Sequence, residues 1–254
     1  MTASDLVRSQ FGPVAEAYVT SSYHASGADL ATLVDTAQLQ DTYNVLDLGC
    51  GAGHTALAVA PHVAHVTAVD LTPDMVAAAT SLAEQRGITN TTFEVADSAR
   101  LPFAGASFDV VTSRAAAHHF ADLRAGLSEA ARVLRPGGRY VIVDTISLED
   151  AALDTFWNCV EILRDASHVR NWRISEWLSM LADAGFSVAH PVESFSIPMD
   201  GTAWVTRMRT PEQKVAMIRT LLDEATPEQR VAFDCRSTEP WGFQIHFALF
   251  SATK

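Results

Sequence analysis

A single decapeptide, Val45-Leu46-Asp47-Leu48-Gly49-Cys50-Gly51-Ala52-Gly53-His54, indicates the fold class more clearly than any other part of the chain. The apolar run from Asn44 to Leu48 predicts a short buried strand, and the run from Thr55 to Val63 predicts a helix. Three glycines alternate over five residues between the two runs. A strand that breaks into glycines and restarts as a helix brings backbone N–H groups close to a ligand.

An acidic residue in the next predicted strand narrows the kind of ligand. Asp70 ends that strand, 21 residues after Gly49, where a carboxylate can accept hydrogen bonds from ribose hydroxyls. The glycines follow G-x-G-x-G rather than the dinucleotide fingerprint G-x-G-x-x-G, and Asp47 precedes them by two residues. A carboxylate at this place repels a pyrophosphate and attracts a cation. The pattern therefore favours an adenosine-containing cofactor with an ammonium group and disfavours an NAD-dependent dehydrogenase.

Composition predicts a globular protein that acts on small molecules. The chain has 254 residues, of which 48% are apolar and 19% are charged, which suits one α/β domain with additions. Its formal net charge is −12, and its pI is about 5.1. Such a charge opposes binding to nucleic acids and to anionic membrane surfaces. We therefore expect a small-molecule acceptor, no nucleic acid and no membrane as partners.

The cysteines and the N-terminus indicate the compartment. The three cysteines, Cys50, Cys159 and Cys235, are widely spaced and form neither a disulfide framework nor a zinc-ligand spacing. The nine histidines contain no H-x-x-x-H pair, so we expect no metal site. Residues 1–8 lack the apolar core of a signal peptide, and no uncharged apolar run reaches about 18 residues. These features predict a cytoplasmic protein. We expect it to be a monomer or a homodimer.

Hydrophobic periodicity predicts alternating strands and helices, the pattern of a parallel doubly wound sheet. Predicted strands lie near 43–49, 65–70, 91–96, 107–113, 138–145, 185–194 and 241–253. Predicted helices lie near 4–20 (interrupted at Gly12-Pro13), 29–39, 54–61, 73–86, 122–134, 150–165, 174–184, 211–223 and 227–235. The two late strands are expected to form a hairpin that completes a seven-stranded sheet. The N-terminal helices and the insert before the last strand could form a lid over a ligand.

Further segments extend the pattern in a fixed order: Val66–Met75, Ala96–Phe103, Ser107–Val111, His118–Phe120 and Arg132–Arg139. Together with the decapeptide they resemble the motifs of class I S-adenosylmethionine (SAM)-dependent methyltransferases, over about residues 40–146. Within that family they resemble most the branch that includes ubiquinone/menaquinone-biosynthesis C-methyltransferases, the methyltransferase type 11 domain. The resemblance implies an α/β fold with a Rossmann-like, doubly wound, seven-stranded sheet and with N-terminal helical and C-terminal lid insertions.

The resemblance also implies an organisation and an activity. We expect a single domain over 1–254, with a helical cap (1–40), a SAM-binding core (41–146) and a substrate-side part (147–254). The implied activity is transfer of a methyl group from SAM to a small-molecule acceptor by in-line displacement, with S-adenosylhomocysteine (SAH) as product. One alternative stays open, since its motifs would look the same: a SAM- or SAH-binding protein of this fold with a non-methylating, cyclase-like or regulatory role.

The cofactor-binding residues are implied by the motifs that they occupy. Asp47 would orient the methionine part, Asp70 would bind the ribose hydroxyls, and Asp97 would accept a hydrogen bond from the adenine amino group. The implied set is Tyr18, Tyr23, Asp47, Gly49, Cys50, Gly51, Asp70, Leu71, Met75, Asp97, Ser98 and Arg114. Arg114 stands where many relatives carry a smaller residue. Because a guanidinium beside a sulfonium is unfavourable, we expect its side chain to face an acidic partner or the substrate.

Three histidines are candidate bases for an acceptor that must lose a proton: His24, His119 and His168. The segment from Arg164 to Trp172 is dense in polar side chains beside a predicted lid helix. It could bind an anionic or aromatic substrate, or it could brace the lid through Arg–Asp pairing.

Overall fold

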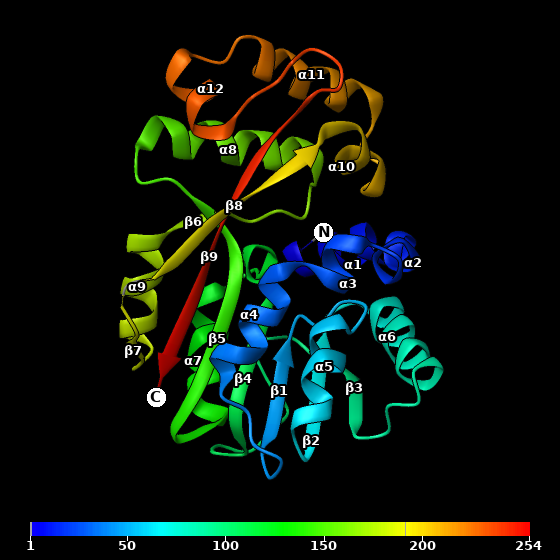
Figure 1. Ribbon diagram of the computed structural model, residues 1–254, viewed down its shortest axis with the longest axis vertical. Helices are drawn as coiled ribbons and strands as arrows, with labels where there is room; N and C mark the ends of the chain where they lie inside the picture. Colours follow the sequence, from blue (N-terminus) through cyan, green and yellow to red (C-terminus); the bar gives the residue numbers. More distant parts are fainter. Residues whose placement is uncertain (1, 191) are drawn as a thin grey trace.

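The computed structural model describes residues 2–190 and 192–254, without the side chains of Ser22 and Tyr23. A twisted sheet flanked by helices forms the lower part of the molecule, and a helical layer lies above one of its edges (Figure 1). The strands are β1 (Asn44–Leu48), β2 (His65–Asp70), β3 (Thr91–Val95), β4 (Phe108–Arg114), β5 (Leu134–Ser147), β6 (Trp172–Arg173), β7 (Ser187–Val188), β8 (Glu193–Asp200) and β9 (Gly242–Thr253).

The helices fall into three groups along the chain. The N-terminal helices are α1 (Ala3–Phe11), α2 (Ala15–Val19), α3 (Ser22–Ser26) and α4 (Ala28–Ala37). The helices that alternate with the strands are α5 (His54–Val59), α6 (Pro73–Gln85), α7 (Leu123–Val133) and α9 (Ile174–Asp183). The helices of the upper layer are α8 (Ala151–Arg164), α10 (Gly201–Arg207), α11 (Glu212–Asp223) and α12 (Pro227–Phe233). Short 3-10 turns are η1 (Gly12–Val14), η2 (Ala60–His62) and η3 (Ala117–His119).

The strand order is β3-β2-β1-β4-β5-β9-β7, with β6 beside β5 and β8 beside β9. Strands β1 to β5 pair in parallel, whereas β9 runs antiparallel to β5, β7 and β8. The strand order reverses between β1 and β4. In open α/β sheets a ligand binds at the carboxyl ends of the strands beside such a switch point.

Two apolar cores cover the two faces of the sheet. Along β1, Val45 packs into the core that includes α4 and α5, and Leu46 packs into the core that includes α7 and α9. This alternation follows from side chains that point to opposite faces of a strand. The first core continues into the upper layer, where Trp157 of α8 stacks on Phe233 of α12 with ring centroids 4.8 Å apart. The upper layer is therefore packed against the sheet through an aromatic core.

Helices α1, α2 and α3 lie between the carboxyl edge of the sheet and the upper layer, whereas α4 packs beside the sheet (Figure 1). The Arg8 guanidinium donates to the Leu71 carbonyl, which follows β2, and the Gln10 side chain donates to the Met208 carbonyl, which follows α10. These contacts tie α1 to both parts of the molecule. Among the described residues, no helix combines the length and the apolar composition that a membrane crossing requires.

The α/β class and the doubly wound sheet are confirmed, but the described residues form a sheet of nine strands rather than seven. The strand predicted near 185–194 is two strands, β7 and β8, and β8 continues to Asp200. Helix α10 was not predicted, although the Asp200 carboxylate accepts a hydrogen bond from the Ala203 N–H as an N-cap. The predicted break at Gly12-Pro13 is present as η1.

Candidate functional site

The glycines after β1 form a tight loop against the end of β2. The N–H groups of Gly49 and Cys50 both donate to the Val69 carbonyl, at 2.8 and 3.0 Å. Gly49 has a φ of 68°, and a Cβ there would lie 2.5 Å from the Ala116 Cβ. Gly51 has a φ of 51°, but a Cβ there would meet no atom within 4 Å. Gly49 therefore permits close packing of the loop, and Gly51 exposes its backbone to open space.

Asp70, the last residue of β2, holds this loop from the side. One carboxylate oxygen accepts from the Gly51 N–H at 2.9 Å, and the other accepts from the Thr72 N–H at 2.8 Å. Burial raises the pKa of Asp70, and these two backbone hydrogen bonds act in the opposite direction. Gly51 and Asp70, which are 19 positions apart in the sequence, are thus in direct contact at the edge of the sheet.

Asp47 lies beneath the glycine loop. Its side chain is buried in β1, and Oδ1 accepts from the Thr112 hydroxyl of β4 at 2.8 Å. The second oxygen, Oδ2, is buried and has no hydrogen-bond partner among the described residues. Burial raises the pKa of Asp47 to about 7. An added cationic group near this carboxylate would stabilise its ionised form.

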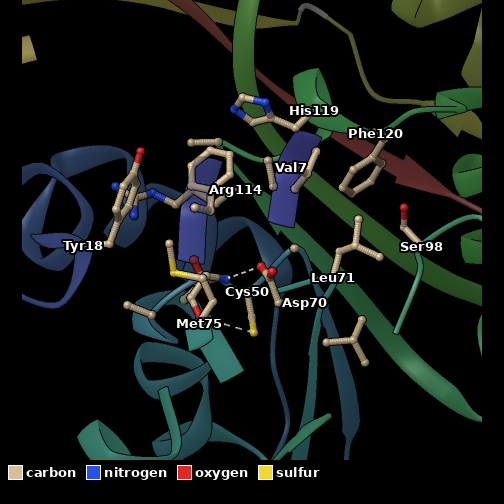
Figure 2. A pocket seen from close by; sticks show the side chains of 18 of the residues that line it. Val7, Tyr18, Cys50, Asp70, Leu71, Met75, Ser98, Arg114, His119 and Phe120 are labelled. Carbon is tan, nitrogen blue, oxygen red and sulfur yellow. Dashed lines mark hydrogen bonds between the residues drawn. The ribbon is translucent and has the colours of Figure 1, made fainter. Parts of the chain in front are cut away.

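A pocket that is open to solvent lies over these residues, and its empty space is about 990 Å³ when the open mouth is included (Figure 2). Ten of the predicted cofactor-binding residues line it: Tyr18, Gly49, Cys50, Gly51, Asp70, Leu71, Met75, Asp97, Ser98 and Arg114. Asp47 does not line it, because it lies beneath the loop, and the predicted Tyr23 side chain lies outside the described residues. The structure thus brings together ten predicted residues from six segments of the chain.

Helix α1, which belongs to the N-terminal segment expected to cover a ligand, contributes a wall whose residues the sequence did not identify. Ser4, Val7 and Phe11 line the pocket, and the Phe11 ring lies edge-on to both Tyr18 and His119. The apolar stripe of residues 4–20 was the available signal, but periodicity does not say which surface such a stripe covers. His54, at the start of α5, also lines the pocket, and its ring bonds to the Tyr18 carbonyl.

Arg114, the last residue of β4, forms a buried ion pair with Asp29 of α4. Nε donates to Asp29 Oδ2 at 2.5 Å, and Nη2 donates to Asp29 Oδ1 at 3.0 Å. A third donor, Nη1, bonds to the His24 carbonyl at 2.9 Å. The prediction that Arg114 faces an acidic partner is confirmed. This bidentate pair fixes the N-terminal helices to the sheet edge.

The three candidate bases occupy different positions. His119 lines the pocket, its Nδ1 faces the Ser167 carbonyl at 3.2 Å, and its Nε2 has no hydrogen bond among the described residues. Burial and the neighbouring His118 lower the pKa of His119 to about 4. His24 also lines the pocket. His168 does not line it, and burial, followed by the charge of His118, lowers its pKa to about 2.

His118 plays a structural part beside these residues. The ring Nδ1 of His118 lies 2.5 Å from Asp144 Oδ1, and the backbone N–H of His118 donates to Asp144 Oδ2. Burial opposes the charge on His118, but the Asp144 carboxylate outweighs this effect, and the pKa is raised overall. The pair connects η3 to the carboxyl end of β5.

The pocket combines charged, apolar and polar side chains. Asp70 contributes a carboxylate, Leu71 and Met75 contribute apolar side chains, and Asp97 and Ser98 contribute polar ones. Tyr18 and His119 also border the pocket (Figure 2).

Comparisons with known proteins agree with this architecture. The profile of the methyltransferase domain matches residues 46–142. YcgJ of Bacillus subtilis, an uncharacterized methyltransferase, is 39% identical over 239 residues, which cover 94% of each chain. The ubiquinone/menaquinone biosynthesis C-methyltransferase UbiE of Rhizobium leguminosarum is 29% identical over 164 residues, or 61% of this chain and 64% of the relative.

Two crystal structures have the same fold over nearly the whole chain. The YcgJ structure has a TM-score of 0.86 at 37% identity and covers 89% of this chain and 97% of its own. A structure from Bacillus halodurans also has a TM-score of 0.86, at 35% identity, and covers 90% of this chain and 99% of its own. The chain therefore belongs to the class I SAM-dependent methyltransferase family.

Proposed function

We propose that the protein transfers a methyl group from SAM to a small-molecule acceptor and releases SAH. One observation carries the proposal: the pocket lies over a glycine loop whose Gly51 N–H bonds to the Asp70 carboxylate at 2.9 Å. Membership of the methyltransferase family supports the reaction class. The acidic surface of the chain, with a net charge of −12, favours a small molecule over a nucleic acid as acceptor.

Two features of the site fit SAM. Open space lies against the Gly51 backbone, where a Cβ would meet no atom within 4 Å, so a ligand can approach the main chain closely. The buried Asp47 Oδ2 has no hydrogen-bond partner within the described part of the chain, and a ligand ammonium group would supply the missing charge. A pyrophosphate at this place would meet repulsion from the same carboxylate.

The pocket residues then take distinct parts in cofactor binding. Asp70 holds the ribose hydroxyls, and Leu71 and Met75 pack against the adenine. Asp97 accepts a hydrogen bond from the adenine amino group, beside Ser98. Gly49, Cys50, Gly51 and Arg114 border the methionine part mainly through their backbones, and Tyr18 and the predicted Tyr23 close the site from the N-terminal side.

Bound SAM supplies an electrophilic methyl group that a nucleophile can displace in line. The protein's own contribution is to hold the acceptor in line with that methyl group and to exclude water. His119 Nε2 is the favoured proton acceptor for an O–H or N–H nucleophile, since it lies in the pocket wall and its lowered pKa keeps it neutral at pH 7. His24 is a second candidate, and His168 could act only after a rearrangement that brings it to the pocket.

The proposal is tested by incubating the protein with methyl-labelled SAM and fractionated small-molecule extracts. We expect labelled product and SAH from the wild-type protein, and neither from Asp70→Ala. Asp74→Ala is the matched control, because Asp74 is an exposed carboxylate in the adjoining turn of α6. SAH binding without SAH formation in any fraction would favour the non-methylating alternative, which family membership does not favour.

The organisation of the chain also remains our proposal. The single domain over 1–254 would comprise a helical cap (1–40), a SAM-binding core (41–146) and a substrate-side part (147–254). A cytoplasmic location and a monomeric or homodimeric state are predictions of the same kind.

A further inference from the structure

Two arginines next to the pocket residue Tyr18 have no carboxylate within ion-pair distance among the described residues. Arg164 ends α8 and is 9% exposed, and Arg207 ends α10 and is partly buried. Across the described residues, neither guanidinium lies within 4.0 Å of a carboxylate oxygen. Arg114, by contrast, is fully paired with Asp29. Burying a guanidinium without a counter-charge costs free energy, unless a bound ligand supplies the negative charge.

Both arginines interact with the hydroxyl of Tyr18. Burial raises the pKa of Tyr18, whereas the charges of Arg164 and Arg207 act to lower it. The Tyr18 hydroxyl also donates to the Met208 sulfur at 3.1 Å. Tyr18 lines the pocket, and its hydroxyl points away from Cys50 and Asp70 (Figure 2). The two guanidinium groups therefore adjoin the pocket at the end opposite the glycine loop.

Existing contacts offset only part of the buried charge. Each arginine lies in the last turn of its helix, where the helix dipole favours a cation. The Arg164 guanidinium lies over the Trp204 ring, 4.5 Å from its centroid, and Nε donates to the Trp204 carbonyl at 3.3 Å. Arg207 Nε, however, is buried and has no hydrogen-bond partner among the described residues. Among the described residues, the Tyr18 hydroxyl is the side-chain hydrogen-bonding partner of both arginines, and it carries no charge that could balance theirs.

The nearest carboxylates compensate the arginines weakly. Glu161 precedes Arg164 by one helical turn, and Asp165 follows it, but both carboxylates lie beyond 4.0 Å from either guanidinium. Burial raises the pKa of Glu161 in spite of the neighbouring arginines. Asp165 is occupied on one oxygen, which accepts from the Ser167 N–H and hydroxyl. The four charges thus form a preorganised cluster rather than closed ion pairs.

We propose that Arg164 and Arg207, with the Tyr18 hydroxyl, bind a carboxylate or phosphate group of the acceptor. The planar guanidinium fork matches both oxyanions and holds them in a fixed orientation. This inference rests on the proposed function and narrows the substrate class to acceptors that carry an oxyanion. The methionine carboxylate of SAM is the competing source of such a group. We assign the subsite to the acceptor because neither arginine lines the pocket over the glycine loop.

Tryptophan fluorescence can test the subsite directly, since Trp204 contacts Arg164. The purified protein is titrated with inorganic phosphate and with acetate, against sodium chloride at equal ionic strength. We expect a saturable change in emission that the chloride control lacks. Arg164→Met and Arg207→Met should each weaken phosphate binding by about tenfold or more, the loss typical of a hydrogen bond to a charged group. Arg124→Met, at an exposed arginine, should change it less than about twofold.

A calorimetric titration with SAH separates the acceptor from the cofactor. We expect SAH affinity in Arg164→Met and Arg207→Met to stay within about twofold of wild type, since SAH carries the methionine carboxylate. A loss of about tenfold in both variants would assign the oxyanion to the cofactor and overturn the proposal. The absence of saturable phosphate and acetate signals would overturn it as well. If SAH failed to bind the wild-type protein, the proposed function would fall, and the phosphate titration would still decide whether the arginines bind an oxyanion.

Folding of the variants is checked by thermal unfolding. Because the arginines lack ion-pair partners, we expect Arg207→Met to unfold at the wild-type temperature or above it. A lower unfolding temperature in both variants would indicate that the arginines already have compensating partners in the free protein, and would contradict the proposal.

Discussion

The buried pair of Arg114 and Asp29 gives the sharpest prediction about stability. The two side chains are 3% and 1% exposed, and they share two hydrogen bonds of 2.5 and 3.0 Å. Asp29→Asn keeps the shape of the side chain but leaves the Arg114 charge buried without its counter-charge. Breaking such a pair from one side costs roughly 3–5 kcal/mol. For a chain of this size, that loss lowers the unfolding temperature by roughly 6–20 °C.

The measurement is urea and thermal unfolding, followed by circular dichroism, with a surface pair as control. Arg124 and Asp183 lie 2.6 Å apart, but each side chain is 62% exposed. Asp183→Asn should therefore cost less than about 1 kcal/mol. The double variant Asp29→Leu/Arg114→Met should lose less stability than Asp29→Asn, because it leaves no orphaned charge. A loss below about 1 kcal/mol for Asp29→Asn would refute the argument that burial sets the strength of this pair.

Three further predictions concern the pocket and its surroundings. Gly51→Ala should weaken SAH binding at least about tenfold, and the protein should remain folded. Gly87→Ala is the control, because Gly87 also has a positive φ and open space around it, and this variant should bind SAH as the wild-type protein does. Calorimetry measures the binding of both variants, and unfolding curves check that both are folded. SAM affinity should fall by up to about tenfold per pH unit below about 7, where Asp47 takes up a proton, and Asp47→Asn should remove that dependence. His119 and His168 have lowered pKa values in the folded state, so their contribution to stability is complete above the unfolded pKa of about 6.5 and is lost as the pH falls. Between pH 7 and pH 5, the free energy of unfolding measured in urea should therefore fall less for His168→Gln than for the wild-type protein. An equal fall in the two proteins would contradict this reasoning.

The parallel half of the fold could be predicted from the sequence because local signals decide it. Buried strands such as β1 and β2 are short apolar runs, and glycine or proline residues end them. The antiparallel half carries weaker signals. β8 lies at an edge with alternating exposed residues and pairs only with β9, so its pairing depends on contacts far apart in sequence. The split of the predicted strand near 185–194 into β7 and β8 therefore required the three-dimensional structure.

The candidate site divides in the same way. Gly51 and Asp70 belong to motifs with fixed spacing, and the structure places them in contact. The wall formed by α1 and the partner of Arg114 depend on how the N-terminal helices dock, which no local pattern encodes. Arg164 and Arg207 lie 43 positions apart, and only the packing of α8 on α10 brings both to Tyr18.

Calorimetric titration of the wild-type protein with SAH tests the central claim most directly, because the claim is that this pocket binds SAM and its product. We predict binding of one SAH per chain with a dissociation constant on the order of micromolar. Asp70→Ala should lose binding by about a hundredfold, since it removes charge-assisted hydrogen bonds to the ribose and support for the Gly51 N–H. Asp74→Ala should bind as the wild-type protein does. No binding by a folded wild-type protein, or equal binding by Asp70→Ala, would contradict the account.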